Sequence, residues 1–340
     1  MKTSIVYSVV IPVYNEEEVL PETYRRLKKV MNRLGEYYEL LFVNDGSRDR
    51  SGAILRELSA ADPTVKAIHF SRNFGHQVAI TAGMDYAQGR AIIVIDADLQ
   101  DPPELIMDMA AKWKTGYDVV YAKRVERRGE SAFKRWTAAL FYRTLRALTD
   151  VDIPADTGDF RLIDRKVCDA LGEVREKNRF MRGLISWVGF RQTAIEYVRD
   201  ERWAGETKYP LRKMLKLSAD AITSFSYKPL KLASYLGFTL SACSFIYLLY
   251  AIAEKLFMST TVPGWASLVC LSLFFNGVVL IILGMMGEYM GRIYDEAKGR
   301  PLYLVGGKDG FERVSFPDDQ DLYRSRHVEH EHDAHIRHYN

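Results

Sequence analysis

Residues 91–103 are Ala-Ile-Ile-Val-Ile-Asp-Ala-Asp-Leu-Gln-Asp-Pro-Pro, an apolar run that ends abruptly in carboxylates. Such a run, bounded by polar and turn residues, is typical of a buried strand. Similar strand-like runs lie elsewhere in the first 125 residues, at Ser8–Val13, Glu39–Val43, Val65–Phe70 and Asp118–Tyr121. Helix-like segments separate them, and apolar strands that alternate with helices predict an α/β fold with a mostly parallel sheet covered on both faces.

Polar residues gather where these strands end. They are Asn15 and Glu16, Asn44 and Asp45, Arg72 and Asn73, and Asp96 and Asp98. In a parallel sheet these ends meet at one edge, where ligands bind. Asn15 is also expected to cap a helix that begins with the acids at 16–18, because acids suit the positive end of a helix dipole.

Asp96-Ala97-Asp98 is the sharpest local signal for chemistry. Hard divalent ions such as Mg²⁺ or Mn²⁺ prefer oxygen ligands and often bridge one or two carboxylates to substrate phosphates. Gln100 continues the same loop, and Asp45 ends a neighbouring strand. Because acids converging at one edge repel each other, the pattern favours a bound cation.

Two segments, Leu232–Ala253 and Ala266–Gly287, contain no Asp, Glu, Lys or Arg. The first has 22 residues and as a helix would extend about 33 Å, enough for a hydrocarbon core of about 30 Å. We therefore expect two transmembrane helices, at about 232–254 and 266–288. A buried helical hairpin of a soluble protein is the alternative.

The charges that flank these segments predict the topology. Positive residues, which stay on the cytoplasmic side, precede the first segment and follow the second, whereas the connecting loop holds only Lys255. Both termini are therefore expected in the cytosol, with the chain crossing the membrane more than once. The net charge of +3 is too small to indicate nucleic-acid binding, and the three cysteines form no motif that suggests a disulfide framework.

We expect four parts along the chain. Residues 1–210 would form the cytosolic α/β domain with the candidate site, including a basic amphipathic interface helix at 133–149, and residues 211–231 would form a second amphipathic helix beside the membrane. Residues 232–290 hold the two spans, and residues 291–340 return to the cytosol. The last of these carries five of the seven histidines. A solvated, disordered tail and a metal-binding segment are the two interpretations of that composition.

Five ordered motifs resemble a known family. They are Val10-Ile-Pro-Val-Tyr-Asn-Glu16, Val43-Asn-Asp-Gly-Ser47, Ser71-Arg-Asn-Phe-Gly75, Asp96-Ala-Asp-Leu-Gln-Asp-Pro102 and Thr157-Gly-Asp-Phe-Arg161. Together they resemble the family 2 glycosyltransferases of the GT-A fold, in the polyprenyl-phosphate branch. That branch includes GtrB-like undecaprenyl-phosphate glucosyltransferases and dolichol-phosphate mannose synthase. The resemblance covers about residues 5–300, including the double span.

This resemblance implies roles for residues on the donor side. Pro12, Tyr14 and Glu16 would line the nucleotide pocket, Asp45 would hold the base or ribose, and Asp96 would contact the sugar side of the nucleotide. The resemblance makes Asp98 and Gln100 the metal ligands. Arg202 lies in a segment similar to the family's loop that closes over the diphosphate, with Thr207 where serine is usual.

On the acceptor side, Arg124, Arg135 and Ser131 are the candidates for holding a lipid phosphate. A guanidinium grips phosphate in a forked geometry that lysine cannot match. Asp159 is the candidate catalytic residue, either as a base or by positioning. A phosphate monoester has a second pKa of about 6 and barely needs a base at neutral pH.

The resulting hypothesis is an inverting transfer of a hexose from a nucleotide diphosphate sugar to undecaprenyl phosphate. UDP-glucose is the first choice of donor, ahead of UDP-GlcNAc, UDP-galactose and GDP-mannose. Other lipid acceptors and a catalytically silent membrane scaffold are the alternatives. The resemblance also implies a homo-oligomer, for instance a tetramer.

Overall fold

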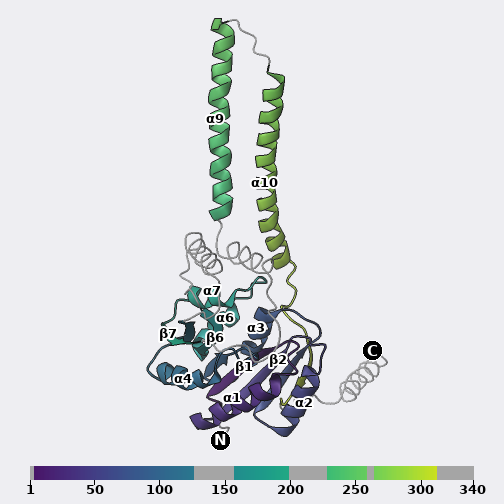
Figure 1. Cartoon of the computed structure of the whole chain (residues 1–340), viewed down its shortest axis with the longest axis vertical. Helices are drawn as coiled ribbons and strands as arrows, with labels where there is room; N and C mark the ends of the chain where they lie inside the picture. Colours follow the sequence, from purple (N-terminus) through teal and green to yellow (C-terminus); the bar gives the residue numbers. More distant parts are fainter. Residues whose placement is uncertain (1–3, 126–156, 199–227, 259–263, 312–340) are drawn as a thin grey trace, which may run out of the picture.

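Strands and helices alternate along the N-terminal half, as the apolar runs predict (Figure 1). The computed structural model describes residues 4–125, 157–198, 228–258 and 264–311. The elements up to residue 125 are β1 (Tyr7–Val13), α1 (Leu20–Leu34), β2 (Tyr38–Asn44), α2 (Ser51–Ala61), β3 (Val65–Phe70), α3 (His76–Tyr86), β4 (Ala91–Val94), the 3₁₀ turn η1 (Pro103–Leu105), α4 (Ile106–Lys114) and β5 (Val119–Arg124). Each predicted strand is present, to within three residues at either end.

The remaining described elements complete the sheet and add two long helices. They are β6 (Thr157–Asp164), α6 (Arg165–Glu173), α7 (Met181–Trp187), β7 (Gln192–Tyr197), α9 (Lys228–Met258), α10 (Trp265–Ala297) and β8 (Val305–Asp309). The strand order is β7-β5-β6-β4-β1-β2-β3-β8. Four of the seven strand pairs are parallel, namely β1–β2, β1–β4, β2–β3 and β5–β7, so the sheet is mixed but mostly parallel.

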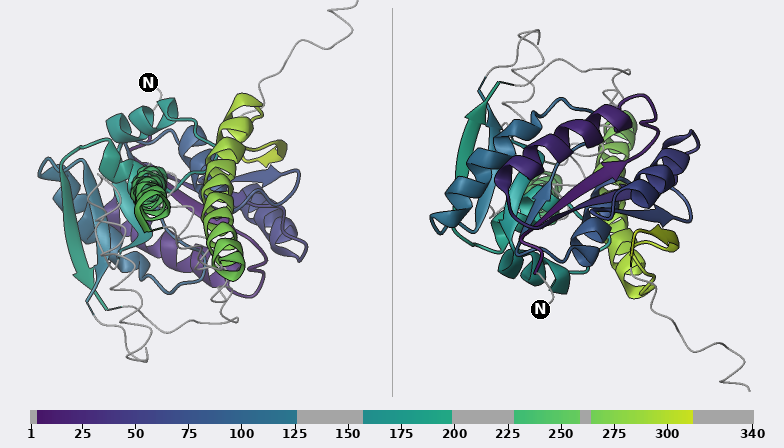
Figure 2. Two further views of the ribbon diagram at one scale, coloured as in Figure 1. Left: turned by 90° about the horizontal axis from the view of Figure 1, so that it is seen from above. Right: turned by 90° about the horizontal axis from the view of Figure 1, so that it is seen from below.

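Both faces of the sheet are covered, which explains why its strands are apolar throughout. On one face, alternate β1 residues such as Val9 and Ile11 pack with side chains of α1, α2 and α4. On the other face, Val10 packs with side chains of α3, α6 and α7. Figure 2 shows these helix layers from two sides. The doubly covered sheet confirms the α/β fold, and its rigid core fixes where each strand ends.

The predicted helix cap at Asn15 is wrong. Helix α1 begins only at Leu20, and Asn15 has a left-handed backbone with φ of 53°. The Asn15 side chain instead accepts a hydrogen bond from the backbone N–H of Arg48 at 2.8 Å. The residues after β1 therefore form a loop joined to the β2–α2 loop, where local sequence suggested a helix start.

Strand β8 was not predicted. It lies after α10 and pairs antiparallel with β3 at the edge of the sheet. Just before it, Tyr303 stacks on Phe70 with ring centroids 5.2 Å apart, and the carbonyl of Leu304 accepts from the Ser71 N–H at 3.0 Å. The chain thus returns from the long helices to the α/β domain and covers an otherwise open strand edge.

Helices α9 and α10 lie alongside each other and project away from the sheet (Figure 1). They have 31 and 33 residues and include the predicted segments 232–254 and 266–288. Large apolar side chains are exposed on both, including Phe238 on α9 and Leu280 on α10. Within the described residues one stretch, Phe274–Ala297, is long and apolar enough to cross a membrane by length and composition. The predicted interface helix 133–149, residues 211–227 and the His-rich tail lie outside the described residues.

Candidate active site

The strand register brings Asp96 and Asp159 to the same point. Strands β4 and β6 are antiparallel, with Val94 opposite Arg161. Asp96 lies two residues after Val94, and Asp159 lies two residues before Arg161. Because the strands are antiparallel, both residues lie beyond the same end of the strand pair, and their side chains come together. The sequence spaces these carboxylates 63 positions apart (159 − 96), and only the antiparallel return of β6 unites them.

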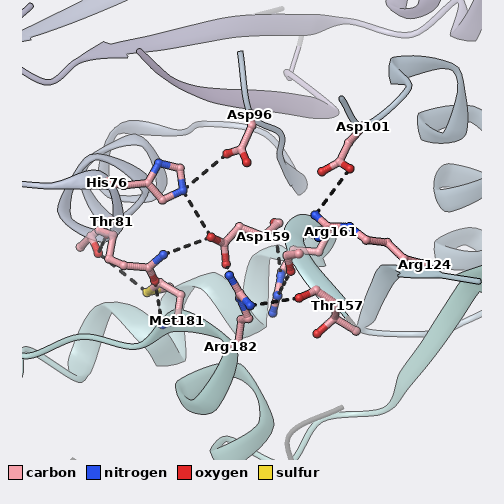
Figure 3. Close-up of polar contacts among 12 residues, drawn as sticks. His76, Thr81, Asp96, Asp101, Arg124, Thr157, Asp159, Arg161, Met181 and Arg182 are labelled. Carbon is pink, nitrogen blue, oxygen red and sulfur yellow. Dashed lines mark hydrogen bonds and ion pairs between the residues drawn. The ribbon is translucent and has the colours of Figure 1, made fainter. Parts of the chain in front are cut away.

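His76 bridges these two carboxylates (Figure 3). It is the first residue of α3, and its Nε2 lies 3.4 Å from Asp96 Oδ1 and 3.3 Å from Asp159 Oδ2. Although burial alone would lower it, the carboxylates of Asp96 and Asp159 raise the pKa of His76 to about 9. The site therefore contains an imidazolium between two carboxylates at neutral pH.

Asp159 is held by further donors and is only 7% exposed. Arg182, on α7, donates from Nε to Asp159 Oδ1 at 3.0 Å, and Gln77 donates from Nε2 to Oδ2 at 3.1 Å. Although burial alone would raise it, Arg182 and His76 hold the pKa of Asp159 well below its usual range. Asp159 is thus an ionised carboxylate beside the cationic side chains of Arg182 and His76.

Asp96 has the opposite electrostatics. Burial raises the pKa of Asp96 to about 6; His76 opposes this rise, whereas the carboxylates of Asp159 and Asp98 add to it. Two carboxyl groups at one edge of the sheet therefore differ widely in acidity. Environments that push carboxyl pKa values apart are a feature of functional sites.

The turn after Asp96 has the donor set for a hard cation. Asp98 Oδ1 accepts from the Gln100 N–H at 3.2 Å, and Leu99 between them has φ of 56°, an uncommon left-handed conformation for a branched side chain. No cluster of three or more His, Cys, Asp or Glu side chains with metal-binding geometry occurs among the described residues. Protein oxygens could supply only part of a coordination shell here, as is usual where substrate phosphates complete it.

Arg124 is placed at the end of β5, as predicted, and it is partly engaged by neighbours. Its Nη2 lies 3.8 Å from Asp101 Oδ1, and its Nε donates to Tyr197 Oη at 3.2 Å. Tyr197 in turn donates to Asp101. The guanidinium is thus held beside the carboxylate cluster while remaining about one-fifth exposed (21%).

The donor-side candidates lie along the neighbouring strand ends. Pro12 is buried in β1, Tyr14 is 38% exposed in the following loop, and Glu16 is half-buried there. Asp45 is buried and accepts from the backbone N–H groups of Phe74 and Gly75, and from the side chain of Asn73. Asp45 therefore anchors the loop that leads into α3 and His76. Ser131, Arg135 and Arg202 lie outside the described residues.

Sequence reasoning did not single out His76, Gln77, Arg161 or Arg182. Arg161 is buried, donates to the carbonyl of Gly158 at 2.7 Å, and has a pKa that burial lowers to about 10. His76 carried one usable signal, since it directly follows the motif Ser71-Arg-Asn-Phe-Gly75. Arg182 carried none, because its link to Asp159 joins α7 to β6.

Comparisons with known proteins identify the family of the chain. Residues 8–172 match the family model "Glycosyl transferase family 2". The chain is 64% identical, over 96% of its length and 100% of the relative's, to "Uncharacterized glycosyltransferase YkcC" of Bacillus subtilis (strain 168). It is 42% identical, over 88% of its length and 96% of the relative's, to "Bactoprenol glucosyl transferase" of Shigella phage SfII.

A third relative, "Uncharacterized glycosyltransferase sll0501" of Synechocystis sp., is 47% identical over 91% of this chain and 97% of its own. The chain belongs to glycosyl transferase family 2 and is a glycosyltransferase. The resemblance inferred from the five motifs is thereby confirmed.

Proposed function

We propose that the chain transfers a hexose, with inversion, from a nucleotide diphosphate sugar to undecaprenyl phosphate at the cytosolic face of the bacterial inner membrane. The observation that carries this proposal is the meeting of Asp96 and Asp159 at His76 (Figure 3), with Asp98 in the turn after Asp96, in a chain whose long helices expose apolar side chains. The bactoprenol glucosyl transferase relatives support a polyprenyl phosphate acceptor and a glucosyl donor. UDP-glucose is therefore the donor of first choice.

The donor would lie over the carboxyl ends of β1, β2 and β4. Pro12, Tyr14, Glu16 and Asp45 would contact the nucleotide, and Arg202 would close on the diphosphate. We place a Mg²⁺ or Mn²⁺ ion at Asp98 and Gln100, because hard oxygens on a constrained turn suit such an ion. When bound, the ion would supply Lewis-acid stabilisation of charge on the departing diphosphate.

The acceptor phosphate would approach from the side of β5 and β6. The guanidinium of Arg124 is proposed to bind this phosphate, together with Arg135 and Ser131 from the adjoining segment. A phosphate oxygen would attack C1 of the sugar from the face opposite the diphosphate. One C–O bond forms as the other breaks, the diphosphate leaves with the electron pair, and no proton has to move.

Asp159 is proposed to position groups, since its low pKa makes it a weak base. Through His76, which also contacts Asp96, it would fix the distance between the acceptor side and the donor side of the site. Charge-assisted hydrogen bonds of this kind preorganise a site before the substrate arrives.

The test is transfer by the full chain in membranes or detergent, with a panel of nucleotide sugars, undecaprenyl phosphate and Mn²⁺, and with the glycolipid identified by mass. Asp98→Ala is expected to lower the rate by about 10²-fold or more, the scale of losing a key electrostatic group in a site. Asp108→Ala, an acid on α4, is the matched control and should behave as wild type. Full activity of Asp98→Ala would refute the metal site, and no glycolipid from any donor would favour a silent scaffold.

A further inference from the structure

Three polar side chains from neighbouring strands form a chain across the edge of the sheet. Asp309 on β8 lies with Oδ2 2.9 Å from Nε2 of His69 on β3. The Nδ1 of His69 lies 3.0 Å from Nδ2 of Asn44 on β2. Asn44 is buried, whereas the side chains of His69 and Asp309 are 13% and 32% exposed, so these contacts are partly shielded from water and are worth more than fully exposed ones.

The direction of each hydrogen bond follows from the next one. The Oδ1 of Asn44 accepts from the backbone N–H of Ser47 at 3.0 Å, so the amide NH₂ must be the end that faces His69. The Nδ1 of His69 then accepts, which leaves the ring hydrogen on Nε2 to be donated to Asp309. We call Asp309, His69 and Asn44 the edge relay.

The edge relay leads directly into the loops proposed to bind the nucleotide. Ser47, held by Asn44, accepts at Oγ from the backbone N–H of Asn15 at 3.0 Å. Asn15 has the left-handed backbone noted above and lies between Tyr14 and Glu16. Asn44 also immediately precedes Asp45. The relay thus ends on both strand-end loops of the proposed donor pocket.

At its other end the relay is fixed by the segment that follows the apolar helix α10. Glu296, near the end of α10, accepts at Oε1 from the backbone N–H of Lys177 at 2.5 Å. Tyr303 donates to Asp85 of α3 at 2.8 Å. Side chains near the two ends of the α10–β8 connection therefore hold strand β8 on the domain. Asp309 thus contacts His69 from a strand whose position is fixed.

We propose that Asp309 is a positioning residue for the donor nucleotide, acting through His69 and Asn44 on the loops at 14–16 and 45–48. This proposal rests on the proposed function only for the identity of the ligand. The ordering of these loops by the edge relay does not depend on which ligand binds. Since Asp309 lies far from them in sequence, the C-terminal segment completes the donor side of the site.

The first test measures loop order without any ligand. Hydrogen exchange of peptides covering residues 44–50 is followed in the full chain in detergent. For Asp309→Ala, exchange is expected to be about three- to tenfold faster, the effect of losing one partly buried hydrogen bond. Lys308→Ala is the control, because it changes the same strand at a side chain that is not part of the edge relay and that lies over the Tyr86 ring, 4.4 Å away.

The second test separates donor binding from catalysis. With UDP-glucose as probe, Asp309→Ala should raise the KM for donor by about three- to tenfold, and change kcat and the KM for lipid phosphate by less than about twofold. Asp309→Asn should restore both measurements, because its amide oxygen can still accept from His69.

The outcomes separate the two proposals. Unchanged exchange in Asp309→Ala, or the same increase in Lys308→Ala, would overturn the relay whatever the transfer assay gives. Absence of transfer by the wild-type chain would overturn the proposed function, and the exchange measurement would still decide the relay.

Discussion

The side chain of Asp159 shows how a buried carboxylate can be functional without acting as a base. It accepts from His76, Gln77 and Arg182, and its ionised form is strongly favoured. A residue in this state has little affinity for a proton. Its contribution is then expected to be geometric, through the cations that it orients.

Comparing Asp159→Asn with wild type at two pH values tests this role. If Asp159 removed a proton from the acceptor, the loss of rate would be larger at about pH 5.5 than at about pH 8, because the second pKa of a phosphate monoester is about 6. We expect the same fold-loss at both values. A loss that shrinks at the higher pH would instead identify Asp159 as a base.

The pH dependence of stability should report the imidazolium of His76. Its folded pKa of about 9 lies above the usual value of 6.5. The stabilisation is therefore fully present below about pH 6.5 and is lost as the pH rises through about 9. In thermal unfolding the midpoint of wild type should fall over this interval, and the midpoint of His76→Gln should fall less.

Gln77→Ala is the control for this measurement, since it removes a neutral donor to the same carboxylate. It should lower the midpoint by a similar amount at every pH. Parallel curves for wild type and His76→Gln between pH 6.5 and 9 would show that His76 carries no such charge.

At the scale of elements, the close packing of helix α3 on β1 fixes the position of His76. A Cβ added at Gly83 would lie 2.1 Å from Cγ1 of Val10, which is fully buried. Gly83→Ala is therefore expected to destabilise the protein by about 1–3 kcal/mol, the range for overpacking a core. Gly172→Ala, on α6 with nothing within 4 Å of the added Cβ, should be neutral or stabilise by up to about 1 kcal/mol.

Unfolding in detergent of these two variants gives the comparison. Gly83→Ala is expected to unfold more easily than wild type and Gly172→Ala is not, and only Gly83→Ala is expected to lose transfer activity, because α3 begins with His76. Equal stability of the two variants would mean that α3 can move away from β1 without cost.

The elements that could be predicted from sequence are those with a local signal. Apolar runs ended by polar residues located β1 to β5, and the motif around Asp96 located one side of the site. Strand β8 has no such signal, because Val305–Asp309 contains two glycines and is held by pairing with β3, which lies far away in the sequence. Likewise, His76 and Arg182 meet Asp159 through contacts between distant elements, which neither periodicity nor composition encodes.

For the whole molecule, helix α10 connects the apolar helices to the α/β domain. α10 continues towards β8, which completes the sheet, and its Glu296 contacts the backbone of Lys177 on the domain. A chain arranged in this way would hold the mouth of the site at a defined height above a bilayer. This arrangement suits an acceptor whose phosphate is carried on a lipid.

The depth of α10 in the membrane gives the last prediction. The proposed span, 266–288, ends before the charges at Arg292 and Asp295, so the middle of the helix should lie in hydrocarbon. The double variant Leu280→Lys with Leu283→Lys, at two exposed positions, should weaken insertion by about 5–7 kcal/mol, from about 2.5–3.5 kcal/mol for each central charge. Ile293→Lys with Tyr294→Lys, also exposed, is the matched control beside existing charges. Because α9 would still anchor the chain, the position of α10 is read from a cysteine placed at Gly277 in a chain whose three native cysteines are replaced by serine. This cysteine should react with a water-soluble thiol reagent in the first variant and stay protected in the control. Its reaction in the chain without lysine substitutions would place α10 outside the hydrocarbon core, and its reaction in both variants would shift the span towards residue 297.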